Sequence, residues 1–242
     1  MKAFLKYFLI FSVLAFWGCG KKSPPLSIEQ SIPKDIYFEV KATQAGFELL
    51  INLPTETRGG YPLTKIKKLI IEKKEIPLDI PKAKEKVYKI KLSPKLHSAG
   101  NLIIYNDYKV KNRYAYTYRI KIEKDFLVKT SYTEPITVYW HNPPGLPKNF
   151  KIIPYEKNMV ILSWEKPVHD IYGLYLEGTI FYEIEKITDS KTEIIKIKNK
   201  KEFWDKIDSS QRTCYSIRAV LNFRGTPIPG PKIPEKCIKI DK

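Results

Sequence analysis

Histidine, cysteine and methionine are scarce in this chain, with three, three and two copies among 242 residues. The histidines, His97, His141 and His169, stand in turn-like or linker segments. The sequence has no HExxH, no GxSxG and no glycine-rich phosphate loop, the patterns of zinc proteases, serine hydrolases and nucleotide-binding enzymes. No two cysteines have the CxxC spacing of a zinc site. We therefore expect no catalytic site, no bound metal and no cofactor.

Two pairs of residues still resemble acid–base machinery. His169 and Asp170 could serve as a base and its orienter, but the spacing places no nucleophile beside them, so we expect both to be solvent-exposed loop residues. Glu183 and Glu185 lie two positions apart among lysines, which is typical of cross-strand ion pairs. Neither pair indicates an enzyme.

Arginine-rich clusters are also lacking, although the formal net charge is +17, with 43 basic and 26 acidic residues. Lysines alternate with acids in stretches such as IKKLIIEKKEI, as on the solvated face of a strand. Arginine supplies the forks that bind phosphates and bases, so the composition argues against nucleic acid as a partner. Salt-dependent attraction to acidic glycans or lipid headgroups fits the charge better.

Helical periodicity is nearly absent beyond residue 32. Short alternating runs such as KVYKIKL, YAYTYRIKI and MVILSW are separated by proline, glycine and asparagine. This pattern predicts an all-β sandwich or barrel. The segment HNPPGLP (141–147) interrupts the series near the middle, and its prolines cannot donate to a strand ladder, so it predicts a short linker.

A long hydrophobic run is missing as well. The apolar stretch at residues 7–17 is shorter than the roughly 20 residues that a membrane-spanning helix needs. Lys2 and Lys6 precede this apolar stretch, and small residues follow it at 18–20. A charged start, a short apolar region and a small-residue cleavage site predict a secretory signal.

The Gly18-Cys19 pair resembles the attachment site of bacterial lipoproteins, although Phe16 and Trp17 stand where that pattern prefers leucine and a small residue. The resemblance implies that Cys19 is lipidated and becomes the mature N-terminus. Each buried methylene contributes about 0.8 kcal/mol, so several acyl chains would hold the protein on a membrane. The implied location is the bacterial cell envelope, with the outer membrane or the periplasmic face favoured. An ordinary secretory signal with an incidental cysteine is the alternative.

The chain divides into a signal peptide (1–18), a lipidated cysteine with a polar tether (19–31), and two domains (32–142 and 143–242). The second domain resembles fibronectin type III through PPGLPKNFKI, MVILSWEKP, FYEIEK and FWDKIDSSQRTCYSIRAVLNFRGTP. The first resembles it less closely, through RGGYPLTKIKKLIIEKKE (58–75), with Leu53 about where the second-strand tryptophan would be.

The resemblance implies an all-β fold of two tandem immunoglobulin-like sandwiches. Trp164 would fill the space between two sheets, and Tyr116 and Tyr215 would bury their rings while each hydroxyl bonds nearby backbone. The expected inward positions are Tyr116, Tyr118, Ile120, Ile122, Tyr215, Ile217, Ala219 and Leu221.

The two remaining cysteines are Cys214 and Cys237. If the last two strands pair about a turn near Gly225, residues whose numbers sum to 451 lie opposite each other, and these cysteines meet. A disulfide there suits an exported protein and would add about 3 kcal/mol. Two buried free thiols are the alternative.

Function in such modules usually lies in the loops between strands. The exposed candidates are residues 54–63 and 169–178, and the second carries Tyr172, Leu174 and Tyr175, which suit recognition of a partner. Packing of these side chains beneath the sandwich or between domains is the alternative.

We expect a membrane-anchored, noncatalytic binding or scaffolding module for an envelope protein or glycan. A surface lipoprotein that binds polyanions through its basic surface is the alternative. The sequence identifies neither the partner nor the oligomeric state.

Overall fold

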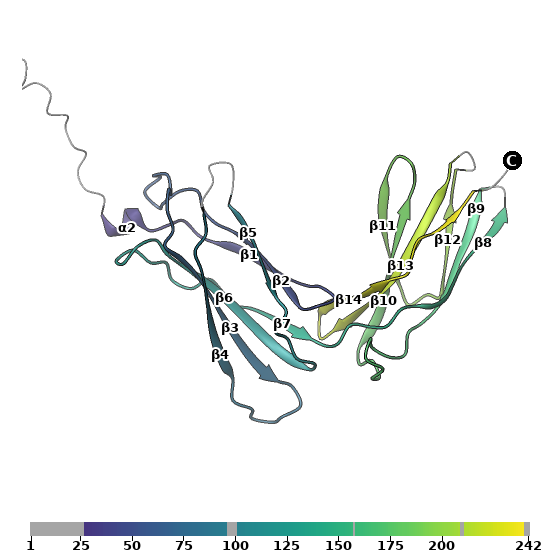
Figure 1. Ribbon diagram of the computed structural model, residues 1–242, viewed down its shortest axis with the longest axis horizontal. Coiled ribbons are helices and arrows are strands. Elements are labelled where there is room, and N and C mark those ends of the chain that lie inside the picture. Colours follow the sequence, from purple (N-terminus) through teal and green to yellow (C-terminus); the bar gives the residue numbers. More distant parts are fainter. Residues whose placement is uncertain (1–26, 96–100, 157, 209–210, 240–242) are drawn as a thin grey trace, which may run out of the picture.

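The structure is a computed structural model that describes residues 27–95, 101–156, 158–208 and 211–239, and it contains two β-sandwiches in tandem (Figure 1). In the first sandwich a three-stranded sheet of order β1-β2-β5 faces a four-stranded sheet of order β4-β3-β6-β7. These strands are β1 (Tyr37–Ala42), β2 (Phe47–Asn52), β3 (Lys68–Pro77), β4 (Lys86–Leu92), β5 (Leu102–Asp107), β6 (Tyr114–Glu123) and β7 (Ile136–Trp140).

The second sandwich repeats this layout. A three-stranded sheet of order β12-β9-β8 faces a sheet of order β11-β10-β13-β14, in which β15 also pairs with β13. These strands are β8 (Lys148–Glu156), β9 (Met159–Glu165), β10 (Thr179–Ile187), β11 (Thr192–Lys198), β12 (Glu202–Lys206), β13 (Thr213–Phe223), β14 (Thr226–Lys232) and β15 (Lys236–Ile238). The fold class is therefore the predicted one, all-β with two tandem fibronectin type III-like sandwiches.

A single short helix, α2 (Ile28–Ser31), precedes the first sandwich in the described part of the chain. Ser27 caps it, because its hydroxyl accepts from the backbone N–H of Gln30 while the Gln30 side chain accepts from the backbone of Ser27. This reciprocal pair satisfies two donors that a helix start leaves open.

The cores of both sandwiches follow the predicted period of two. The inward positions of β6 and β13 are completely buried, since alternate side chains of a strand point to the same face. All eight expected residues are among them: Tyr116, Tyr118, Ile120, Ile122, Tyr215, Ile217, Ala219 and Leu221.

The centre of the second sandwich holds Trp164, whose ring meets Tyr182 edge to face at 5.1 Å between centroids. Leu53 has the corresponding backbone position in the first sandwich. Its N–H donates to the carbonyl of Asn101, just before β5, at 3.1 Å, and the N–H of Trp164 donates to the carbonyl of Lys201, just before β12, at 3.0 Å. Leu53 is buried in the core of the first sandwich.

The two aligned tyrosines use their hydroxyls differently. The hydroxyl of Tyr116 accepts a 2.6 Å bond from the backbone N–H of Lys111, as expected. The hydroxyl of Tyr215 instead donates to the carboxylate of Asp205, so the prediction of a backbone partner is wrong there. Burial raises the pKa of both hydroxyls, most of all through lost hydration, which keeps them protonated.

The predicted linker at 141–147 is packed into the junction between the sandwiches. His141 is buried and its ring lies 5.1 Å from that of Phe223, between centroids. The backbone N–H of Tyr139 donates to the hydroxyl of Thr226 at 2.9 Å, and the Gln44 side chain donates to the carbonyl of Gly230 at 2.9 Å. The prolines exclude regular strand pairing in this segment, as predicted. The segment is nevertheless part of a junction in which hydrogen bonds and ring contacts connect the two sandwiches.

The end of the chain also differs from the simple hairpin that was expected. Phe223 and Thr226 flank the turn at Gly225, and β14 then runs along β13 as an edge strand that contains three prolines. The register of this β13–β14 pairing shifts between Arg218 and Val220, and β15 pairs with the start of β13, at Thr213 to Tyr215. Edge strands tolerate proline because their outer N–H groups need no partner.

Candidate partner-binding site

The loop at residues 169–178 lies between β9 and β10, beside the junction of the sandwiches (Figure 1). It exposes large apolar side chains. Tyr172 is 72% exposed, Leu174 is 55% exposed and Tyr175 is 77% exposed, and Ile171 is also exposed. Of the two alternatives that the sequence left open for these residues, the structure shows the exposed one. A loop with this many large apolar side chains in solvent is a candidate interface.

Asp170 holds this loop in one shape. Its Oδ1 atom accepts bonds from the backbone N–H groups of Tyr172 at 2.8 Å and Leu174 at 2.9 Å. Its own N–H donates to the carbonyl of Leu174 at 2.7 Å. Only 4% of Asp170 is exposed, so the prediction that it is a solvent-exposed loop residue is wrong, because its carboxylate serves as the acceptor that closes the turn.

The same carboxylate ties the loop to the chain that enters the second sandwich. Asp170 Oδ2 accepts a 2.8 Å bond from Asn142 Nδ2, and the N–H of Ile171 donates to the carbonyl of Pro143 at 3.0 Å. Glu177, at the other end of the loop, forms an ion pair with Arg113 of the first sandwich. The loop is therefore bonded at both ends to residues outside it.

Electrostatics favour the charged form of Asp170. Burial alone would raise the pKa of its carboxyl, but the bonds from Asn142 and from the N–H groups of Leu174 and Tyr172 outweigh burial and lower this pKa. The order that Asp170 gives to the loop is thus complete above its ordinary pKa of 3.8. It is lost as the pH falls through the lowered value.

A glycine and a ring contact also shape the loop. Gly173 adopts a φ of +87°, a conformation that glycine reaches without strain, and a Cβ there would meet open space. His169 is exposed and its ring lies 4.7 Å from that of Tyr175, between centroids. Sequence reasoning missed the contact of His169 with an aromatic side chain, because the two residues meet across the loop.

The two other sites predicted from cysteine have different outcomes. Cys214 and Cys237 lie opposite each other on β13 and β15 and are joined by a disulfide. Cys19, the proposed lipidation site, and the signal peptide around it lie outside the described residues. In the described part of the chain, no helix has the length and hydrophobicity needed to cross a membrane.

The first sandwich contains a buried charged cluster that sequence reasoning missed. Lys73 Nζ lies 2.5 Å from Asp107 Oδ2 and donates to the carbonyl of Lys109 at 2.6 Å. Tyr118 donates its hydroxyl to Asp107 at 2.7 Å. These partners already engage the charged groups, so the cluster supports the fold and is not a catalytic candidate. No group of potential metal ligands is found within the described ranges.

Comparison with known proteins yields likeness in fold only. No protein-family model and no curated protein matches the chain. The chicken CNTN1 FN1-FN3 domains are 11% identical with a TM-score of 0.47, covering 87% of this chain and 64% of that chain. A two-domain fibronectin type III segment from chicken tenascin is 14% identical with a TM-score of 0.33, covering 86% of this chain and 98% of that chain. This chain thus spans less than two thirds of the first of these structures.

Proposed function

We propose that this protein is a lipid-anchored, noncatalytic binding module of the bacterial cell envelope, and that the 169–178 loop binds a protein partner. The observation that carries the proposal is the exposure of Tyr172, Leu174 and Tyr175 on a loop already fixed by Asp170. Tyrosine is enriched at interfaces because its ring buries a large area at a small entropic cost. A loop that is ordered before binding loses less entropy on association.

A photocrosslinking experiment in cells tests the loop. A photoreactive amino acid at position 172 or 175 is expected to give a discrete crosslinked product. The matched control is position 126, where Phe126 is 80% exposed on the first sandwich. The same product from position 126, or none from 172 and 175, would contradict the proposal.

The partner identified in this way then allows a binding measurement. Replacing Tyr172 and Tyr175 with alanine is expected to weaken affinity at least tenfold, since tyrosine anchors commonly contribute 2 kcal/mol or more. Both side chains are exposed, so the free energy of unfolding should change by less than about 0.5 kcal/mol. Affinity should change little between 50 and 300 mM salt, whereas a steep loss would favour the polyanion-binding alternative.

The lipid anchor has its own test. The intact mass of protein extracted from native membranes is expected to correspond to a chain that begins at Cys19 and carries acyl groups. Cys19→Ala should move the protein from the membrane to the soluble fraction. An unprocessed chain without lipid would overturn this part of the proposal and leave the loop proposal standing.

A further inference from the structure

A second surface, distinct from the 169–178 loop, lies where the two sandwiches meet. An open groove of about 570 Å³, called here the junction groove, is lined by β1 and β7 of the first sandwich and by the outer face of β10, β11, β13 and β14 of the second. Its apolar lining includes Val40, Phe181 and Val220. The three strands β1, β7 and β14 lie close together at its base, as Figure 1 shows for the region where the sandwiches join.

The charge of the junction groove is strongly asymmetric. Four basic side chains line it, Lys41, Lys196, Arg218 and Arg224, against one acid, Glu183. Glu183 is already shared, since it binds Arg218 at 2.5 Å and lies 3.7 Å from Lys196. A net excess of positive charge between two walls attracts an anionic partner.

Arg224 is the most available of these cations. It stands on the β13–β14 turn, 5.9 Å from the ring centroid of Tyr139 and 5.8 Å from that of Phe223. Among the ion pairs of the described residues none includes Arg224. A guanidinium placed on aromatic rings at the edge of a groove is well suited to bind a carboxylate.

The backbone of β1 supplies a second feature. Among the described strands β1 pairs only with β2, so its other edge is open. The N–H of Thr43 donates to Gly46 at 2.8 Å, and antiparallel pairs alternate between bonded and unbonded. The backbone groups of Phe38, Val40 and Ala42 therefore point away from β2, toward the open side.

The neighbouring edges at the junction are less able to accept another strand. Pro227, Pro229 and Pro231 interrupt the outer edge of β14, where they offer no N–H. On β7 the N–H of Tyr139 is already bonded to Thr226. In contrast to β7 and β14, the edge of β1 thus keeps its donors beside the groove.

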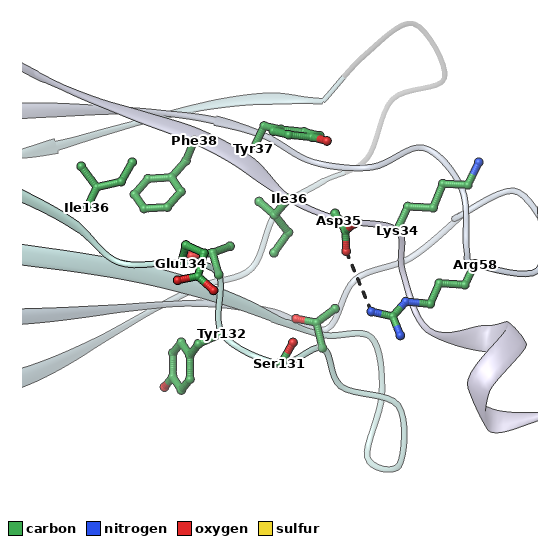
Figure 2. A pocket seen from close by; sticks show the side chains of 12 residues that line it. Lys34, Asp35, Ile36, Tyr37, Phe38, Arg58, Ser131, Tyr132, Glu134 and Ile136 are labelled. Carbon is green, nitrogen blue, oxygen red and sulfur yellow. Dashed lines mark ion pairs between the residues drawn. The ribbon is translucent and has the colours of Figure 1, made fainter.

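A second pocket of about 510 Å³, drawn in Figure 2, lies beside the first residues of β1, Tyr37 and Phe38. Phe38 and Ile136 line this pocket, and the ion pair between Asp35 and Arg58, 3.9 Å apart, lies at its far end. A strand added to β1 could place apolar side chains in this pocket. The other end of the added strand would then face the charged wall of the junction groove. The six residues of β1 offer an edge of about 20 Å.

From these observations we infer that the junction groove binds an extended acidic segment of a partner protein, which adds as a strand to the edge of β1. Backbone bonds to β1 would supply affinity, and Arg224 and Lys196 would select carboxylate-bearing segments. This is the strand-addition mode of peptide recognition. The inference does not depend on the partner of the 169–178 loop.

The test uses the full chain in detergent and a fluorescein-labelled peptide of sequence (Glu-Val)₄, with (Lys-Val)₄ as the charge control. Binding is followed by fluorescence anisotropy at 150 mM salt. The double variant Lys196→Glu/Arg224→Glu is expected to weaken binding of the acidic peptide at least tenfold. The matched double variant Lys65→Glu/Lys84→Glu changes the net charge equally on exposed residues outside the groove and should alter affinity less than twofold.

Equal losses in the two double variants would show general attraction to the basic surface and overturn the inference. Binding of (Lys-Val)₄ as tightly as (Glu-Val)₄ would also overturn it. Absence of any measurable binding of the acidic peptide to the parent protein would do the same.

A backbone variant tests strand addition. Val40→Pro removes an outward N–H and should weaken binding at least tenfold, while Val40→Ala keeps the N–H and should change affinity less than threefold. If Val40→Pro does not fold, hydrogen exchange on the parent protein decides instead. The amides of Phe38, Val40 and Ala42 should exchange more slowly when (Glu-Val)₄ is bound, and no added protection would overturn strand addition.

Discussion

The two sandwiches contain the same lysine–aspartate–tyrosine network, but the first one buries it more completely. Lys73 and Asp107 have side-chain exposures of 5% and 3%, whereas Lys186 and Asp205 of the second sandwich have 14% and 13%. The lysine–carboxylate distances are 2.5 Å and 2.6 Å, so the geometry of the contact is nearly the same. The difference lies in how far each network is removed from water.

The two networks have the same strand register. Lys73 pairs with Tyr118 on β6, and Lys186 pairs with Tyr215 on β13. Each of these tyrosines donates its hydroxyl to the aspartate of its own network, so register does not account for the difference in burial. A charge buried as fully as that of Lys73 needs every donor satisfied, and Lys73 meets this need through the carbonyl of Lys109 and a position 4.6 Å from the ring centroid of Tyr116.

The largest expected effect comes from removing the two lysines. Lys73→Met should lower the free energy of unfolding by about 3–5 kcal/mol, because it leaves the Asp107 carboxylate buried without its counter-charge. Lys186→Met should cost about 1–3 kcal/mol, since water reaches Asp205 more easily. Urea denaturation combined with hydrogen exchange on β6 and β13 measures each sandwich separately. If both variants lost the same free energy of unfolding, the burial of the network would not control the cost of removing its lysine.

The disulfide distinguishes the sandwiches next, because in the described part of the chain only the second contains one. Replacing both Cys214 and Cys237 with serine should lower the stability of the second sandwich by about 3 kcal/mol. The first sandwich should change by less than about 0.5 kcal/mol. The same two-probe unfolding experiment measures both, and a comparable loss in the first sandwich would show that the junction couples them.

The hydroxyls of the aligned tyrosines should give smaller and unequal effects. Tyr215→Phe removes a donor from the charged Asp205 and should cost about 1.5–3 kcal/mol. Tyr116→Phe removes an acceptor from the Lys111 N–H and should cost about 1 kcal/mol. Thermal unfolding of the two variants under identical conditions gives the comparison, and a larger loss in Tyr116→Phe would refute it.

Acid should affect the first sandwich through the buried carboxyl of Glu75. Burial would raise the pKa of Glu75, but bonds from Lys111 and Tyr88 outweigh it, so the pKa falls below its ordinary 4.5. The stabilisation is present above pH 4.5 and disappears as the pH drops through the lowered pKa. Glu75→Gln should make the stability of the first sandwich less dependent on pH in this range. We expect this to be the smallest of the four effects. Hydrogen exchange of the β6 amides between pH 3 and 6 measures it. An unchanged slope would exclude Glu75 as the titrating group.

Much of the fold could be predicted from the sequence because strand period and turn residues are local signals. They placed the inward side chains of β6 and β13 correctly and brought Cys214 opposite Cys237. The same signals could not place Lys73, because a lysine within KLIIEKKEI reads as a solvated residue. Its burial depends on Asp107, a partner contributed by a distant strand.

The 169–178 loop shows the same limit at the candidate site. Its tyrosines and leucine were visible in the sequence, but their exposure was not. Asp170 was expected in solvent, whereas Asn142 and the backbone of the loop enclose it. The edge strand β14 was also missed, because proline normally argues against a strand and β14 contains three.

The Cys214–Cys237 bond has a mechanical consequence for a chain held at one end and pulled at the other. Tension applied to the C-terminus passes from β15 directly into β13 through the covalent link. The 23-residue interval that includes β14 is thereby shielded from the pull. When the second sandwich is stretched, its extension should be shorter by about 80 Å than that of a reduced chain, and β14 should stay beside the first sandwich until β13 itself gives way.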